Sequence, residues 1–236
     1  MSAAPSHVAY ESDIAPIAAL ISDRTRAAML TALLDGRALA AGELARLAGV
    51  SPATASSHLA RLLDGRLITM EAQGRHRYYR LAGSEVARVL ETIALISPPI
   101  QVRSLRQSRQ AAMLRTARTC YDHLAGRAGV ALLDALLDKG VLIPAGETYE
   151  VPADGEELLA GFGVDVPAVR RSRRKFAGPC LDWTERRPHL NGALGAALTA
   201  RLIDLGWLVR GRERRALVIT DTGRAGLADV FGCLLD

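Results

Sequence analysis

The stretch SPATASSHLARLLDGRLI, residues 51–68, decides the fold of the N-terminal part of this 236-residue chain. Ser51 is a favourable N-cap and Pro52 suits the first helical position, so we expect a helix to begin there. Gly65 predicts its end. The apolar residues of the segment recur at helical spacing and predict one buried face, made of Ala55, Leu59, Leu62 and Leu63.

The other face of this predicted helix is polar and carries no acid. The sequence continues into a turn-prone segment at 73–75 and a strand-like segment at 76–81. A helix with small polar groups and one arginine, followed by a hairpin with a basic tip, is typical of a winged helix-turn-helix. The alternative is a helix and hairpin with a merely solvated face. The candidate DNA-binding residues are Ser51, Thr54, Ser56, Ser57, His58, Arg61, Arg75, His76 and Arg77.

The segments upstream supply the remaining helices of such a motif. Residues 21–34 predict an amphipathic helix capped by Ser22 or Asp23, and residues 42–49 predict a short helix ended by Gly49. A first helix is expected over 13–21, and residues 1–12 are expected to be flexible. Together these segments resemble the ArsR/SmtB family of winged-helix transcriptional regulators over residues 13–97. The residues that carry the resemblance are Ser22 to Arg26, Glu43 to Ala45, Val50 and Ser51, Ser56 to Leu59, Gly74 and Arg75, and Tyr78 and Tyr79.

The resemblance implies a homodimer that binds double-stranded DNA. In the family, the helix after the wing, here from Ser84 to Ile96, packs with the first helix across a two-fold axis. Two recognition helices then reach successive half-sites of the duplex. The resemblance supplies no metal site, because residues 41–44 are Ala-Gly-Glu-Leu where metal-sensing relatives carry paired cysteines. Any sensing is therefore expected in the added C-terminal domain.

Composition agrees with a DNA-binding protein of the cytoplasm. Lysine and arginine number 30 against 25 acids, for a net charge of +5, which favours a polyanionic partner. No apolar run approaches the roughly 18 residues that span a membrane, so no membrane partner is expected. The N-terminus lacks the pattern of a signal peptide, and three cysteines do not make a disulfide framework.

Two basic segments remain open to interpretation. Residues 98–119 are expected to form a basic linker helix after the break at Pro98 and Pro99, with five arginines and no acid over residues 100–118. That helix is either solvated between domains or in contact with phosphate. The cluster at 170–175 is most simply a solvated basic face, and its alternatives are a grip on flanking DNA or on an anionic ligand.

An internal repeat organises the C-terminal domain, residues 120–236. The segment HLAGRAGVALLDALLDKGVLI (123–143) aligns in register with HLNGALGAALTARLIDLGWLV (189–209), and each continues into a hairpin and a new helix start. We therefore expect a mainly α fold with small β-hairpins (α+β). It would comprise the winged helix-turn-helix and two duplicated winged-helix-like helix–hairpin units. Glycine and alanine on the repeat helices favour close packing rather than DNA reading.

A Cys-x-Asp triplet precedes the histidine that opens each copy. If the copies face one another, two thiols and two imidazoles converge and form a plausible tetrahedral set for Zn²⁺ or another thiophilic metal: Cys120, His123, Cys180 and His189. The neighbouring residues Asp122, Asp182 and Trp183 would border a small-molecule effector pocket. A thiol redox switch and plain core packing remain alternatives.

The sequence favours a regulator over an enzyme. Cys120 and His123 are the one pair that suggests a nucleophile and base, and no nucleotide loop or paired catalytic carboxylates accompany them. We therefore expect a sequence-specific DNA-binding transcriptional regulator, a repressor released by an effector sensed in the C-terminal domain. The alternatives are a thiol- or metal-dependent redox sensor or enzyme using Cys120 and Cys180, and a protein-binding winged-helix adaptor.

Overall fold

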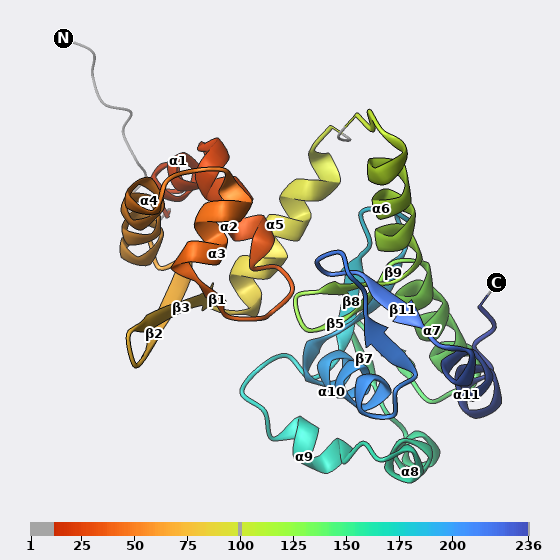
Figure 1. The fold of residues 1–236 in the computed structure, drawn as a ribbon. Coiled ribbons are helices and arrows are strands. Elements are labelled where there is room, and N and C mark those ends of the chain that lie inside the picture. Colours follow the sequence, from red (N-terminus) through yellow and green to blue (C-terminus); the bar gives the residue numbers. More distant parts are fainter. Residues whose placement is uncertain (1–11, 99–100, 236) are drawn as a thin grey trace. The chain divides into compact units, whose positions relative to one another are not determined.

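The structure is a computed structural model, and it describes residues 12–98 and 101–235. Its contacts divide the chain into two compact units, Met1–Val86 and Ala87–Asp236. The predicted flexible segment 1–12 lies outside the described residues except for its last residue. In both units short antiparallel strands join helices (Figure 1), so the predicted fold class, mainly α with small hairpins, is confirmed.

The first unit is a winged helix. Asp23 caps the second helix by accepting from Arg26 N at 2.9 Å, and Gly49 ends the third in the left-handed conformation that glycine tolerates. One three-stranded antiparallel sheet has the order β1-β3-β2. The elements are α1 (Ala15–Ser22), α2 (Arg24–Ala32), β1 (Leu39–Ala40), α3 (Ala41–Ala48), α4 (Pro52–Asp64), β2 (Ile68–Gln73), β3 (His76–Leu81) and the start of α5 (Ser84–Ile96).

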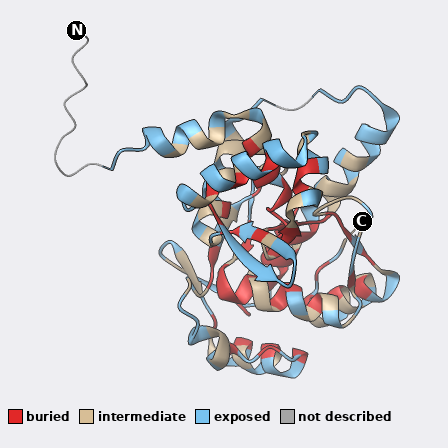
Figure 2. Cartoon of the chain, turned by 60° about the vertical axis from the view of Figure 1, so that its left-hand side comes forward, coloured by how far each residue is buried: buried red, intermediate tan, exposed pale blue. Residues whose placement is uncertain are grey.

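A core of leucines holds α2, α3 and α4 together. Leu30, Leu44 and Leu59 are buried, one from each helix. Each belongs to the buried face of its own helix, and the three helices contact one another, so they share one apolar interior. Polar residues of α4 and of the hairpin β2–β3 remain on the outside of this unit (Figure 2).

The second unit repeats one order of elements, hairpin, helix, hairpin, helix, with α9 added between the copies. It begins with α6 (Leu105–Thr116). The first copy is β4 (Arg118–Cys120), β5 (His123–Ala125), α7 (Arg127–Asp138), β6 (Ile143–Ala145), β7 (Thr148–Glu150) and α8 (Ala153–Phe162), followed by α9 (Val166–Arg170). The second copy is β8 (Gly178–Leu181), β9 (Pro188–Asn191), α10 (Gly192–Asp204), β10 (Leu208–Arg210), β11 (Leu217–Ile219) and α11 (Asp221–Phe231).

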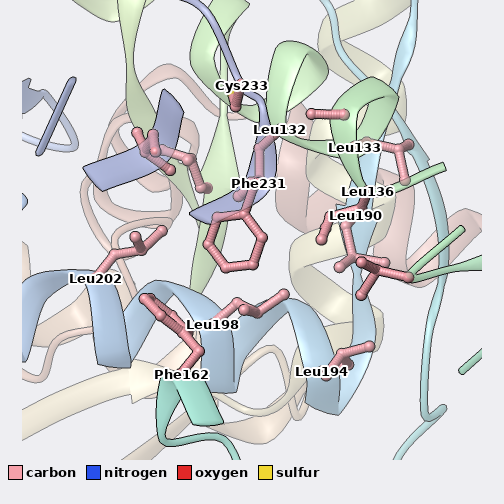
Figure 3. Packing of buried hydrophobic residues seen from close by; sticks show 14 of the residues in the cluster. Leu132, Leu133, Leu136, Phe162, Leu190, Leu194, Leu198, Leu202, Phe231 and Cys233 are labelled. Carbon is pink, nitrogen blue, oxygen red and sulfur yellow. The ribbon is translucent and has the colours of Figure 1, made fainter. Parts of the chain in front are cut away.

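The two copies pack reciprocally. Helix α7 of the first copy lies on β9 of the second, and α10 of the second copy lies on β5 of the first. Between α7 and α10, leucines and the ring of Phe231 fill one core (Figure 3). Phe231 meets Phe162 edge to face, with ring centroids 4.9 Å apart. The descent of both copies from a winged-helix element remains a prediction.

The linker helix is shorter than expected. The sequence predicted a basic helix within 98–119, but α6 covers only Leu105–Thr116, and Arg118 begins strand β4. Arg118 is fully buried, so it does not belong with the solvent-facing arginines of α6. Residues 99 and 100 lie outside the described chain. Among the helices that the structure describes, none combines the length and apolarity needed to cross a membrane.

Candidate functional site

Helix α4 presents a short row of exposed polar side chains. The hydroxyl of Ser51 caps the helix by accepting from Thr54 N at 3.2 Å, and it also lies 2.9 Å from the Thr54 hydroxyl. Ala55, Leu59 and Leu62 point into the core, so the remaining positions face outward. The exposed candidates from the sequence are Ser51, Thr54, Ser56, Ser57 and Arg61.

His58 differs from its neighbours on this helix. Its ring is partly buried, and Nδ1 lies 3.5 Å from Asp23 Oδ1 at the start of α2. The sequence suggested that this face was free of acids, but the fold brings a carboxylate from another helix beside the imidazole. His58 therefore lies at the contact between α2 and α4. Its side chain is less exposed than those of Thr54 and Arg61, so less of it is available to contact a DNA base.

The hairpin β2–β3 carries the basic tip predicted from the sequence. Gly74 takes a positive φ of 59° in the two-residue turn, a conformation that suits glycine. Arg75, His76 and Arg77 follow it and are exposed. Tyr79 anchors the strand in the core. The result is an antiparallel hairpin with two arginines and a histidine at its end, here termed the basic wing (Arg75, His76, Arg77).

The four candidate metal ligands of the second unit meet at one point. In β4–β5 the cross-strand partner of Cys120 is His123, and in β8–β9 the partner of Cys180 is His189. Their ligand atoms all lie within 4.8 Å of one another, and the two Sγ atoms are 3.9 Å apart. The imidazoles stack with centroids 5.1 Å apart. We term these four residues the Cys–His cluster.

Two glycines make room for the cluster. A Cβ added to Gly129 of α7 would lie 2.5 Å from Leu124 O and 3.4 Å from His189 Cβ. A Cβ added to Gly195 of α10 would lie 2.5 Å from Leu190 O and 3.3 Å from His123 Cβ. Each glycine therefore lets its helix approach its own hairpin and the histidine of the other copy. The glycines predicted to allow close packing do so here.

A carboxylate stands behind each histidine and is in turn held by an arginine. Asp122 Oδ1 lies 3.3 Å from His123 Nδ1, and Arg174 donates to the same carboxylate. Asp182 Oδ2 lies 3.6 Å from His189 Nδ1 and accepts from Arg118 at 2.9 Å. The candidate effector residues Asp122 and Asp182 are thus outer neighbours of the cluster.

Trp183 and the basic segment 170–175 also have structural partners. The Arg118 guanidinium lies 4.5 Å from the centre of the Trp183 ring. Arg170 pairs with Glu156 at 3.2 Å and Arg174 with Asp122. Acids remote in sequence therefore meet these two arginines in the fold, and Arg174 is partly buried while Arg170 stays exposed.

Burial and hydrogen bonding shift the pKa values around the cluster. The Cys120 thiol and the neighbouring imidazoles hold the pKa of Cys180 well below its usual range, whereas contact with Cys180 and burial raise the pKa of Cys120. Burial lowers the pKa of His123, but Asp122 and Cys180 outweigh that effect and raise it. The two thiols therefore differ strongly in their ease of ionisation.

Known proteins resemble both the first unit and the whole chain. A helix-turn-helix domain model matches residues 21–71. A Bacillus subtilis protein, the uncharacterized HTH-type transcriptional regulator YdfF, is 45% identical over 212 residues, covering 90% of this chain and 94% of that protein. The chain belongs to the HTH-type transcriptional regulators. The winged helix-turn-helix predicted from the sequence is confirmed in this regulator.

Two further relatives match the regulator over about a third of its length. The HTH-type transcriptional regulator CmtR of Mycobacterium tuberculosis is 38% identical over 80 residues, covering 34% of this chain and 67% of that protein. The solution structure of the homodimeric winged helix-turn-helix domain Mb0332 of Mycobacterium bovis is 28% identical, with a TM-score of 0.33, and covers 38% of this chain and 89% of that chain.

Some residues that shape the regulator's second unit escaped the sequence analysis. Thr199 of α10 accepts from Leu124 N at 2.8 Å and donates to Gly195 O at 2.8 Å, so it fixes β5 beside the cluster. Arg118 and Arg174 hold the two carboxylates. The lone signal for Thr199 was a polar residue on the apolar side of a repeat helix. Nothing local distinguished Arg118 from the arginines before it.

Proposed function

We propose that this regulator is a cytoplasmic homodimeric repressor that binds specific sites in double-stranded DNA. An effector bound in its second unit releases it from the DNA. The observation that carries the DNA-binding part is the exposed polar row of α4 followed by the basic wing. Thr54, Ser57 and Arg61 offer hydrogen bonds to base edges in the major groove. Arg75 and Arg77 offer positive charge to phosphates or to the minor groove.

The proposed homodimer rests on apolar side chains that a single chain leaves uncovered. Val89 and Ile96 of α5 are 47% and 84% exposed, and Ile14 before α1 is 76% exposed. Burial of such side chains against a second copy is favourable. A two-fold dimer would also set two α4 helices at half-sites about one helical turn, roughly 34 Å, apart.

The effector part rests on the Cys–His cluster. Buried titratable groups with shifted pKa values gather at functional sites more often than elsewhere. This cluster lies where the two copies of the second unit meet, and none of its residues belongs to α4 or the wing. A ligand held by both hairpins has contacts with both copies, which is the requirement for biasing how they pack.

Selection of duplexes from a random pool, followed by fluorescence anisotropy at several salt concentrations, tests DNA binding. We expect enrichment of an inverted repeat, and an operator affinity that falls linearly with salt on a log–log plot. Light scattering of the free protein should give twice the chain mass. Equal affinity for selected and random duplexes would contradict sequence-specific binding, and absence of any salt-dependent binding would favour the protein-binding adaptor.

A further inference from the structure

The Cys–His cluster has the donor set of a metal site. Cross-strand partners in an antiparallel hairpin project from the same side, so each hairpin presents one thiol and one imidazole together. The reciprocal packing of α7 and α10 brings the two hairpins face to face. Two thiols and two imidazoles, all buried or nearly so, are the ligands of tetrahedral Cys₂His₂ zinc sites.

The separations suit one ion. With Zn–S about 2.3 Å and Zn–N about 2.0 Å, tetrahedral geometry requires ligand atoms about 3.3 to 3.8 Å apart. The two Sγ atoms lie 3.9 Å apart and no pair among the four ligand atoms exceeds 4.8 Å. Contraction by about an ångström at the widest pair, within reach of side-chain rotation, brings all four donors to bonding distance.

The Nε2 atoms of the two imidazoles lack hydrogen-bond partners. His123 Nε2 and His189 Nε2 are buried and have no hydrogen bond to any described residue. Buried polar atoms are normally satisfied, so two such nitrogens side by side point to a missing ligand. A metal ion accepts both lone pairs at once.

The outer carboxylates are placed to orient these nitrogens. Metal-bound histidines commonly direct the other ring N–H at a carboxylate. Asp122 lies 3.3 Å from His123 Nδ1, and Asp182 lies 3.6 Å from His189 Nδ1, so both rings keep Nε2 for the cluster. A hydrogen bond is formed in the first copy, whereas the longer separation in the second leaves His189 Nδ1 without one to any described residue.

Charge favours a divalent cation. Two thiolates and two neutral imidazoles carry a charge of −2, which a divalent ion neutralises in a buried site. Arg174 and Arg118 already neutralise the two outer carboxylates. Thiolate and imidazole donors select Zn²⁺, Cd²⁺ or a similarly thiophilic ion over Mg²⁺ or Ca²⁺.

We propose that Cys120, His123, Cys180 and His189 bind one thiophilic divalent cation of the Zn²⁺ class, which joins the two repeat copies of the second unit. This inference rests on the proposed function in one respect only: it names the chemical class of the effector that the second unit would bind. Binding of the ion is measured without DNA, so the two proposals fail separately.

Metal titration of the full chain tests the inference. Protein purified with a reductant and stripped by a chelator is titrated with Co²⁺, and separately with Zn²⁺ against a chromophoric chelator. We expect one equivalent per chain, a near-ultraviolet thiolate-to-cobalt charge-transfer band and the intense visible bands of tetrahedral Co²⁺. The double substitution Cys120→Ser, Cys180→Ser should abolish these signals.

The third cysteine provides the matched control. Cys233 is also a buried thiol of the second unit, yet it is not part of the cluster. Cys233→Ser should keep one equivalent of metal and the cobalt spectrum. If the reduced wild-type chain binds no Co²⁺ or Zn²⁺, or if Cys233→Ser loses as much metal as the double variant, the inference is overturned.

Thermal unfolding of the wild-type chain avoids reliance on variants that fail to fold. At a hundred-fold excess of Zn²⁺ over its dissociation constant, the melting temperature of the second unit should rise by roughly 5–10 °C. Mass spectrometry after alkylation counts thiols in parallel. If Cys120 and Cys180 form a disulfide and the reduced protein binds no metal, the proposed metal site is overturned and the two cysteines are identified as a redox pair.

Operator binding separates this inference from the proposed function. Zinc loading should weaken operator affinity by about 5- to 150-fold, the usual range of allosteric coupling, and leave the double variant unaffected. If the protein binds metal but no specific DNA site, the proposed repressor function is overturned and the proposed metal site is retained. Specific DNA binding that zinc does not change would overturn the naming of the effector.

Discussion

The guanidinium of Arg118 donates to the carboxylate of Asp182 at 2.9 Å, and neither side chain is exposed to solvent. Arg118 begins β4 and Asp182 follows β8, so the pair ties the hairpins of the two repeat copies together. Asp182 also accepts from Gly126 N at 2.7 Å and from the Thr184 hydroxyl at 2.6 Å. The carboxylate is therefore well supplied with hydrogen bonds, which a buried charge requires.

Breaking this pair should destabilise the second unit. Asp182→Asn leaves the Arg118 charge buried without a counterion and should lower the free energy of unfolding by about 3–5 kcal/mol. Asp134→Asn is the matched control, because its ion pair with Arg187 is solvent-exposed and should be worth about 0–1 kcal/mol. Urea unfolding followed by circular dichroism measures both. Equal, small losses would show that Arg118 finds another partner.

The same pair should respond to acid. Arg118 and the hydrogen bonds of Asp182 hold the pKa of that carboxyl below its ordinary value, despite burial. Its stabilisation is therefore complete above the unfolded pKa of about 4 and declines as the pH falls towards the lower folded pKa. In chelator-treated protein, the difference in unfolding free energy between wild type and Asp182→Asn should shrink from pH 6 to pH 3. A constant difference would contradict this assignment.

Arg61 should carry sequence preference. Its exposed guanidinium on α4 is the longest donor available to a base edge, so Arg61→Ala should weaken binding to the selected operator by about 1–3 kcal/mol. Affinity for random duplex should change much less, so the preference at one base position relaxes. Competition anisotropy with operators altered at single positions measures this.

Arg75 should carry affinity without preference. It lies at the exposed tip of the wing, where phosphate is the expected partner. Arg75→Ala should weaken binding to all duplexes alike and reduce the slope of log K against log salt by about 1. Salt titrations of operator and random DNA provide the measurement. If Arg61→Ala and Arg75→Ala lose specificity equally, the two roles have been misassigned.

Asp122 should tune the metal site. Asp122→Asn weakens the acceptor behind His123 and should reduce Zn²⁺ affinity by about 10- to 100-fold while keeping one equivalent per chain. Glu156→Gln is the control, because it breaks the pair of Arg170 in the same basic segment without touching the cluster. Competition with a chromophoric chelator gives both constants. Unchanged affinity in Asp122→Asn would show that Asp122 serves only Arg174.

The winged helix followed from the sequence because its signals are local. Ser51 and Pro52 start α4, Gly49 ends α3 and Gly74 turns the wing, and each works through backbone geometry within a few residues. Apolar spacing then decides which face of α4 is buried, and so which residues are left for DNA. The repeat likewise predicted which cysteines and histidines correspond.

The tertiary structure alone decided which distant charges meet. Arg118 resembles the other arginines before it, yet it is buried against Asp182, and His58 lies beside Asp23 of another helix. Periodicity reports the face of an element but not the element opposite, and ion pairs depend on that opposite element. The separation of Cys120 and Cys180 is of the same kind, since it follows from how the two copies pack on each other.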